Sequence, residues 1–162
     1  MNRRILAALL IVAAVMFSTV AVLAFQHGGG GSAIGAVYTM TNDDEANQVV
    51  VFERDASGIL TLAGSVATGG LGSGGGLDPL ASQDSLVLTD NGRFLLAVNA
   101  GSNNITVFRI LPDGLEMIGL FGSGGEFPVS LAIDRNLVYV LNAGGSANIT
   151  GFWLSPKGDL IP

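Results

Sequence analysis

Residues 94–108 read FLLAVNAGSNNITVF, and residues 137–152 read LVYVLNAGGSANITGF. In both stretches a short apolar run ends in asparagine, and a second apolar run, after a loop that contains glycine, ends in phenylalanine. Residues 37–52, VYTMTNDDEANQVVVF, repeat the pattern with Asn42 in the place of Asn99 and Asn142. The two later copies lie 43 to 44 residues apart. A period in the low forties is typical of proteins that stack copies of one supersecondary unit.

Each copy is predicted to form four antiparallel strands. In the second copy they are Ser85–Thr89, Phe94–Asn99, Asn104–Leu111 and Glu116–Phe121. Asp90-Asn91-Gly92 and Pro112-Asp113-Gly114 favour tight reversals, because Asn and Gly accept the positive φ that such turns demand. No segment after Ala36 has the apolar spacing of a helix. Unbroken apolar runs, such as VVVF at 49–52, indicate strands that are covered on both faces,.

The sequence therefore predicts an all-β fold, a β-propeller of four-stranded antiparallel blades. The blades cover about 36–66, 84–121 and 128–162, and a glycine-rich insertion, Gly69–Leu80, separates the first two. About two and a half to three blades are present, whereas closed propellers have four to eight. We therefore expect a partial sequence, whose partners are the remaining blades of the same chain.

The N-terminus has the pattern of an export signal. Arg3 and Arg4 precede an apolar stretch, and Val22-Leu23-Ala24 offers small residues for a cleavage site,. Residues 1–24 are therefore interpreted as a signal peptide, or as an uncleaved membrane anchor, since the stretch approaches the length of a bilayer span. Residues 25–35, with four consecutive glycines, are expected to form a flexible leader. The expected location is secreted, periplasmic or at the cell surface.

Composition excludes several classes of function. Beyond residue 24 the chain carries five basic and thirteen acidic residues, so its formal charge is −8. Such a chain lacks the cationic face that nucleic acid requires. It contains no cysteine, and its one histidine, His27, lies in the leader. Nucleophilic triads and histidine or thiolate metal sites are therefore excluded, and neither a cofactor nor a metal is expected.

Three stretches carry a resemblance to a known family: LLAVNAG at 95–101, GGEFPVS at 124–130 and LVYVLNAGG at 137–145. They resemble the lactonase family of seven-bladed propellers, which includes 6-phosphogluconolactonase-like proteins and 3-carboxymuconate cyclases. The resemblance covers about residues 36–162 and implies seven blades, the first of them completed by a strand from the C-terminus. It also implies action on a lactone or a related small carbohydrate or acid. The catalytic histidine and arginines of that family match no position here.

The candidate site residues lie near the connections that lead into the innermost strands, because these connections surround the mouth of a propeller's central channel. Asp78, Asp84 and Glu126 fit this description, and Arg93 and Arg135 are their possible charge partners. Opening or forming a lactone requires an acid or base and a group that stabilises the oxyanion, so a carboxylate with an arginine is the minimal set. Carboxylates in surface turns are the simpler explanation for each of these residues.

Three further motifs have simpler structural explanations. Residues 70–75 have GxGxxG spacing, but no helix start follows, which favours a long loop between blades. Asp43-Asp44-Glu45 matches no calcium loop and is predicted to be a solvated turn. Asn104-Ile105-Thr106 and Asn148-Ile149-Thr150 match the glycosylation sequon, yet they recur at the repeat period and are predicted to start strands,.

Two functions remain open at this point. The first is an exported enzyme of lactonase or muconate cycloisomerase type. The alternative is a non-catalytic extracellular propeller that serves as a binding or scaffold module.

Overall fold

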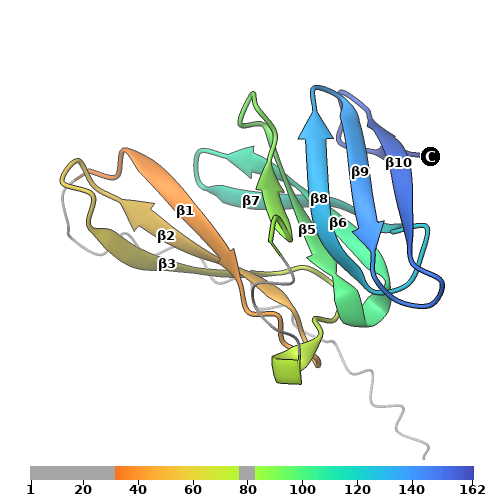
Figure 1. Cartoon of the computed structure of the whole chain (residues 1–162). Helices are drawn as coiled ribbons and strands as arrows, with labels where there is room; N and C mark the ends of the chain where they lie inside the picture. The colour runs from red at the N-terminus through yellow and green to blue at the C-terminus, as the bar shows by residue number, and fades with distance from the viewer. Residues whose placement is uncertain (1–31, 77–82) are drawn as a thin grey trace, which may run out of the picture.

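The computed structural model describes residues 32–76 and 83–162. The predicted signal or anchor, residues 1–24, and most of the leader lie outside this part. Three antiparallel sheets follow one another along the chain (Figure 1). Blade 1 has three strands: β1 (Gly35–Met40), β2 (Gln48–Arg54) and β3 (Leu60–Ala67). Within the described part, no helix is long and apolar enough to cross a membrane.

Blades 2 and 3 each have four strands in the order of the sequence. Blade 2 contains β4 (Leu86–Leu88), β5 (Phe94–Asn99), β6 (Asn104–Leu111) and β7 (Gly114–Gly122). Blade 3 contains β8 (Pro128–Asp134), β9 (Leu137–Asn142), β10 (Asn148–Leu154) and β11 (Leu160–Ile161). The prediction of four-stranded antiparallel blades is confirmed, and the strands of the second copy lie within two residues of their predicted bounds.

The blades stack face to face through two apolar cores. One core, between blades 1 and 2, is formed by Val49 and Val51 with Leu95, Ala97 and Phe108. The other lies between blades 2 and 3 and includes buried residues from β5, β6, β8, β9, β10 and β11. All six residues of β5 are buried, because one face of this strand contacts blade 1 and the other contacts blade 3. This burial on both faces explains why apolar and polar residues do not alternate along the strand.

The register of β1 differs from the alignment that the sequence suggests. In blade 2, Val98 precedes Asn99 and pairs with Ile105, the first apolar residue of β6. In blade 1, Met40 pairs with Val49, the first apolar residue of β2. Thr41, and not Asn42, therefore occupies the place of Asn99. A slip of one residue would move the apolar side chains of β1 to the other face of the sheet, so packing against blade 2 determines the register. The alignment of Asn42 with Asn99 was therefore wrong by one position.

A buried polar group joins blades 1 and 2 beside the apolar core. Asn99 is fully buried, and its Oδ1 accepts hydrogen bonds from Asn47 Nδ2 (2.9 Å) and Thr68 Oγ1 (2.7 Å). Its Nδ2 donates to Asn104 Oδ1 (2.8 Å) and Thr106 Oγ1 (2.9 Å). The asparagine and threonine of the first sequon motif therefore hold Asn99, and Asn104 begins β6 as predicted.

The equivalent group between blades 2 and 3 is incomplete. Asn142 Nδ2 donates to Ser123 O and Thr150 Oγ1, both at 3.3 Å, but the buried Oδ1 has no partner among the described residues. Asn103 holds the position that Asn47 holds in blade 1, since its carbonyl oxygen accepts from Ser123 N just as that of Asn47 accepts from Thr68 N. Asn103 has a left-handed backbone, and its Oδ1 accepts from Phe127 N instead (2.7 Å).

This difference predicts unequal effects of two matched substitutions. Asn99→Ala is expected to reduce the free energy of unfolding by about 2 kcal/mol more than Asn142→Ala, because the first removes four hydrogen bonds of 2.7–2.9 Å and the second removes only two, both of 3.3 Å,. Urea denaturation of the two variants checks this, provided that the m-values agree. Equal losses would mean that the four hydrogen bonds of Asn99 have no net value in this interface.

The strands define two ends of the molecule. The connection end carries the described parts of the links between blades, residues 68–76, 83–85 and 123–127, together with the loops after β1, β5 and β9. The turn end carries the short turns after β4 and β8 and those after β2, β6 and β10. In Figure 1 the arrowhead of β9 points to the connection end, and that of β8 points to the turn end.

Candidate functional site

Glu126 lies on the connection between β7 and β8, which the neighbouring loops hold in place. Its carbonyl oxygen accepts from Gly144 N (2.9 Å), and that of Phe127 accepts from Ala143 N (2.9 Å). Asn103 Oδ1 accepts from Phe127 N on the other side. The connection is thus bonded to the loop after β9 and the loop after β5, so the backbone that carries Glu126 has a defined position.

Two glycines leave room for the Glu126 side chain. A Cβ on Gly145 would lie 3.0 Å from Glu126 Oε2, and a Cβ on Gly144 would lie 3.1 Å from Glu126 Cβ. Gly145 also has a φ of +54°, which favours glycine,. The carboxylate itself is exposed, and within the described part of the chain it makes no hydrogen bond or ion pair. The sequence did not reveal this contact, although the Gly144-Gly145 pair is a signal for a close approach of two chain segments.

The repeat shows that Glu126 is not required by the fold. Gly101 N donates to Leu71 O (3.0 Å) as Gly144 N donates to Glu126 O, so Leu71 holds the same position on the preceding connection. A leucine and a glutamate therefore occupy one structural position. The fold therefore does not require a charged side chain at this position.

The other predicted carboxylates of this end do not gather around Glu126. Asp84 precedes β4 with a φ of +59°, is exposed, and its carbonyl oxygen accepts from Leu131 N (3.0 Å). Leu131, which Asp84 contacts, lies five residues after Glu126. Asp84 and Glu126 therefore lie on neighbouring connections, and their carboxylates are not in contact. Asp78 lies outside the described residues.

The loop after β1 carries the acidic cluster that the sequence predicted to be a solvated turn. Asp43 Oδ1 accepts from Glu45 N and Ala46 N, both at 2.8 Å. These backbone N–H groups, that of Ala46 first, hold the pKa of Asp43 below its usual range. Asp44 and Glu45 are exposed. No three His, Asp or Glu side chains in residues 32–76 and 83–162 come close enough together to hold a metal ion.

The glycine-rich residues 69–76 run between blades 1 and 2, as predicted for an inter-blade loop. Gly72 N donates to Asp43 O (2.6 Å), and Asn42 Nδ2 donates to Ser73 Oγ (2.8 Å). Gly74–Gly76 form a short 3-10 turn, η1. The stretch therefore packs onto the loop after β1, and the spacing of its glycines serves this close packing.

Arg93 and Arg135 lie at the turn end, away from the carboxylates that they were expected to accompany. Arg135 directly follows β8, and Glu126 lies just before that strand's first residue. A strand of this length spans roughly 20 Å. The expected pairing of Arg135 with Glu126 is therefore wrong, and the length of the intervening strand could have shown this.

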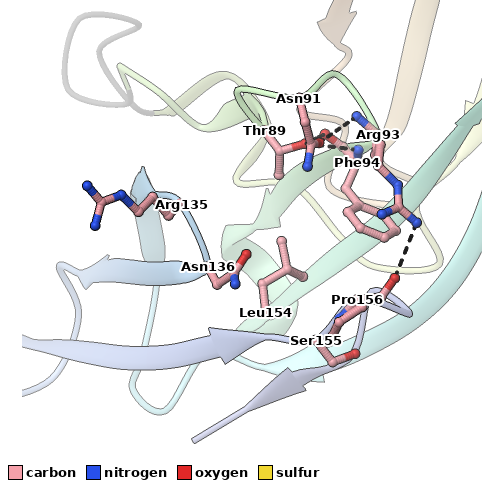
Figure 2. A pocket seen from close by; sticks show the side chains of 9 residues that line it. All are labelled: Thr89, Asn91, Arg93, Phe94, Arg135, Asn136, Leu154, Ser155 and Pro156. Carbon is pink, nitrogen blue, oxygen red and sulfur yellow. Dashed lines mark hydrogen bonds between the residues drawn. The ribbon is translucent and has the colours of Figure 1, made fainter.

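The two arginines instead line a cavity of about 130 Å³ between blades 2 and 3 (Figure 2). Arg93 Nη2 donates to Pro156 O (3.4 Å), and its guanidinium lies 5.4 Å from the centre of the Phe94 ring. Figure 2 shows the Arg135 side chain extending away from the other lining residues. The lining includes Asn91 and Asn136 but no carboxylate. One guanidinium is thus bonded to the backbone and the other extends away, so we regard this cavity as a weaker candidate for the functional site than the surroundings of Glu126.

Comparison with known proteins agrees with the three-blade architecture. The family model described as lactonase, 7-bladed beta-propeller, matches residues 78–159, about half of the chain. No curated protein matches the chain.

Several solved structures share the fold. A protein from Lactobacillus plantarum is 24% identical, with a TM-score of 0.57 over 78% of this chain and 39% of that one. A functionally unknown protein from Desulfotomaculum acetoxidans is 20% identical, with a TM-score of 0.58 over 79% of this chain and 40% of that one. The periplasmic gluconolactonase of Pseudomonas aeruginosa is 20% identical, with a TM-score of 0.56 over 82% of this chain and 39% of that one.

This chain thus spans about two fifths of the length of these structures. The matched segment covers most of blades 2 and 3, whose repeat and stacking define the fold. By its sequence and its architecture, the chain belongs to the lactonase family of seven-bladed β-propellers.

Proposed function

We propose that this protein is an exported propeller enzyme that opens a lactone ring, with Glu126 as the general base. The observation that carries the proposal is the free carboxylate of Glu126 at the connection end, beside Gly144 and Gly145 and in the position that Leu71 holds in the other copy. Family membership supplies the chemical class, since lactonases act on lactones. The similar Pseudomonas aeruginosa protein is a periplasmic gluconolactonase.

The chemistry requires a base and donors to the developing oxyanion. Glu126 takes a proton from water as the water oxygen attacks the lactone carbonyl carbon. The bond between that carbon and the ring oxygen then breaks, and the proton passes to the ring oxygen. The backbone N–H groups of Gly145 and Ser146 donate to no group within the described part of the chain, so they are available to the oxyanion. No arginine is needed for this arrangement.

The ring is completed, in this proposal, by further blades of the same chain. Leu137, Tyr139 and Leu141 on β9 are 41–46% exposed. The matching residues of β5 pack against blade 3, so the same face of blade 3 is suited to another blade. The free edge of β1 similarly leaves room for a fourth strand of blade 1,.

The proposed export rests on the N-terminal sequence, with its two arginines and the apolar stretch that follows,. Cell fractionation combined with mass determination of the mature protein tests it. A mature N-terminus near residue 25 outside the cytoplasm supports cleavage, and an intact N-terminus in the membrane fraction supports an anchor. Recovery of the intact chain from the cytoplasm contradicts export.

The enzymatic proposal is tested with the full-length gene product on a panel of aldonolactones and muconolactones. Glu126→Gln is expected to lower kcat by about 100-fold or more with little change in stability, because the amide cannot accept the proton. Asp113→Asn, which removes an exposed carboxylate at the turn end, is the matched control and is expected to leave kcat unchanged. No turnover of any lactone, or full activity of Glu126→Gln, contradicts the assignment.

A further inference from the structure

Basic residues are absent from the connection end of the described blades. Within residues 32–76 and 83–162 there are five of them. Each lies at the turn end, on a turn or on the part of a strand next to one: Arg54, Arg93, Arg109, Arg135 and Lys157. Two of them are bonded there to blade 3, since Arg93 and Arg109 donate to the carbonyl oxygens of Pro156 and Lys157. Their positions are therefore part of the packing between blades 2 and 3.

Acidic residues, in contrast, occur at both ends. Five lie at the connection end, all of them exposed: Asp43, Asp44, Glu45, Asp84 and Glu126. The turn end carries acidic residues together with all five basic ones. Arg109 and Glu116 form a salt bridge of 2.8 Å there. The end that holds the proposed site thus has only one sign of charge within the described blades.

A surface with charges of one sign discriminates between substrates by their charge. A phosphate with two negative charges about 10 Å from one carboxylate is disfavoured about 4-fold in water before screening by salt. Several carboxylates act together, and at low ionic strength the effect reaches across the face, because the Debye length is about 30 Å at 0.01 M salt. A neutral substrate has no such penalty.

We infer that the substrate of this site is an uncharged lactone, and that lactones bearing a phosphate or carboxylate group are rejected. This inference rests on the proposed function, and it deepens that function by naming the charge class of the substrate. The chemistry that fits is a polyhydroxylated ring whose hydroxyl groups bond to backbone and carboxylate acceptors. Such a ring needs no cation for its recognition.

The test compares glucono-1,5-lactone with its 6-phospho derivative on the full-length gene product. The neutral lactone is expected to have a kcat/KM at least about 10-fold higher at about 0.01 M ionic strength, and the ratio is expected to shrink as salt is added. Comparable or better turnover of the phosphorylated lactone overturns the inference.

A charge variant tests the cause. Asp44→Asn, Glu45→Gln and Asp84→Asn together are expected to raise the phospho-to-neutral ratio of kcat/KM by about 3-fold at low salt. The matched control neutralises three exposed carboxylates of the turn end, with Asp90→Asn, Asp113→Asn and Asp134→Asn, and should leave the ratio unchanged. An equal change in both triple variants overturns the inference.

A binding measurement separates failure of this inference from failure of the proposed function. Calorimetric titration compares 1,5-anhydroglucitol with its 6-phosphate, which have no lactone bond to open. If neither lactone is turned over but the neutral analogue binds more tightly, the proposed reaction fails and the charge preference stands. Tighter binding of the phosphate, or binding of neither analogue, overturns the inference.

Discussion

Phe108→Ala in the 162-residue chain is expected to lower the free energy of unfolding by about 4 kcal/mol. Phe108 is fully buried and packs between blades 1 and 2 with Val49, Val51, Leu95 and Ala97. Truncation removes the transfer energy of the ring and leaves a cavity that two sheets can close only by moving together. The measurement is denaturant unfolding followed by far-UV circular dichroism.

The repeat offers matched comparisons for this substitution. Phe152, which is 5% exposed, holds the same position between blades 2 and 3 and should respond similarly. Phe52 also holds this position, but it pairs with the exposed Val37 on the face of blade 1 turned away from blade 2. We expect Phe52→Ala to cost only about 1 kcal/mol. Equal costs for Phe52 and Phe108 would contradict the stacking of blades as the main source of stability.

Gly101→Ala is expected to destabilise the chain by about 3 kcal/mol, through steric overlap. A Cβ at this position would overlap the carbonyl oxygen of Gly72 and lie 3.3 Å from Leu71 Cβ. The residues 69–76 would have to move away, and the hydrogen bond from Gly101 N to Leu71 O (3.0 Å) would weaken,. Because this stretch includes η1 and packs on the loop after β1, its shift would disturb the connection end of blade 1.

Gly122→Ala is the control for this prediction. A Cβ on Gly122 meets no atom within 4 Å, and its φ is not in the left-handed region, so this change should be neutral or slightly stabilising,. Hydrogen exchange of the backbone N–H groups of Gly72 and Gly101 identifies where Gly101→Ala acts. A loss of stability in Gly122→Ala as large as in Gly101→Ala would mean that the effect is not local packing.

Several features of the fold could be predicted from the sequence because they are encoded locally. The Asp90-Asn91-Gly92 turn and the apolar runs on either side of it define a hairpin within a few residues. The distance of 43 to 44 residues between Asn99 and Asn142 and between Phe108 and Phe152 repeats that unit, and from this the blades follow,. Glu126 and Asp84 lie on the connections that precede β8 and β4, and a catalytic role for either of them stays a prediction.

Other features depend on contacts between segments far apart in the chain. The register of Thr41 is determined by packing of β1 against blade 2, and the place of the Glu126 side chain depends on two glycines from the loop after β9. Asn142 Oδ1 has no partner because the Asn103 side chain of the neighbouring blade bonds to Phe127 N and not to Asn142. None of these contacts leaves a periodic signal, because each joins residues that differ between the copies.

The class of fold and the number of strands in each blade follow from the sequence alone, because turns and apolar runs act over a few residues and recur. The family follows from the resemblance of three short stretches. Which charged residues share one end of the molecule, in contrast, depends on the tertiary structure. Chain direction reverses at every strand, so Glu126 and Arg135, separated by a single strand, lie at opposite ends,. That separation leaves the carboxylates of the connection end without a cation among the described blades, and from it the expected preference for an uncharged substrate follows.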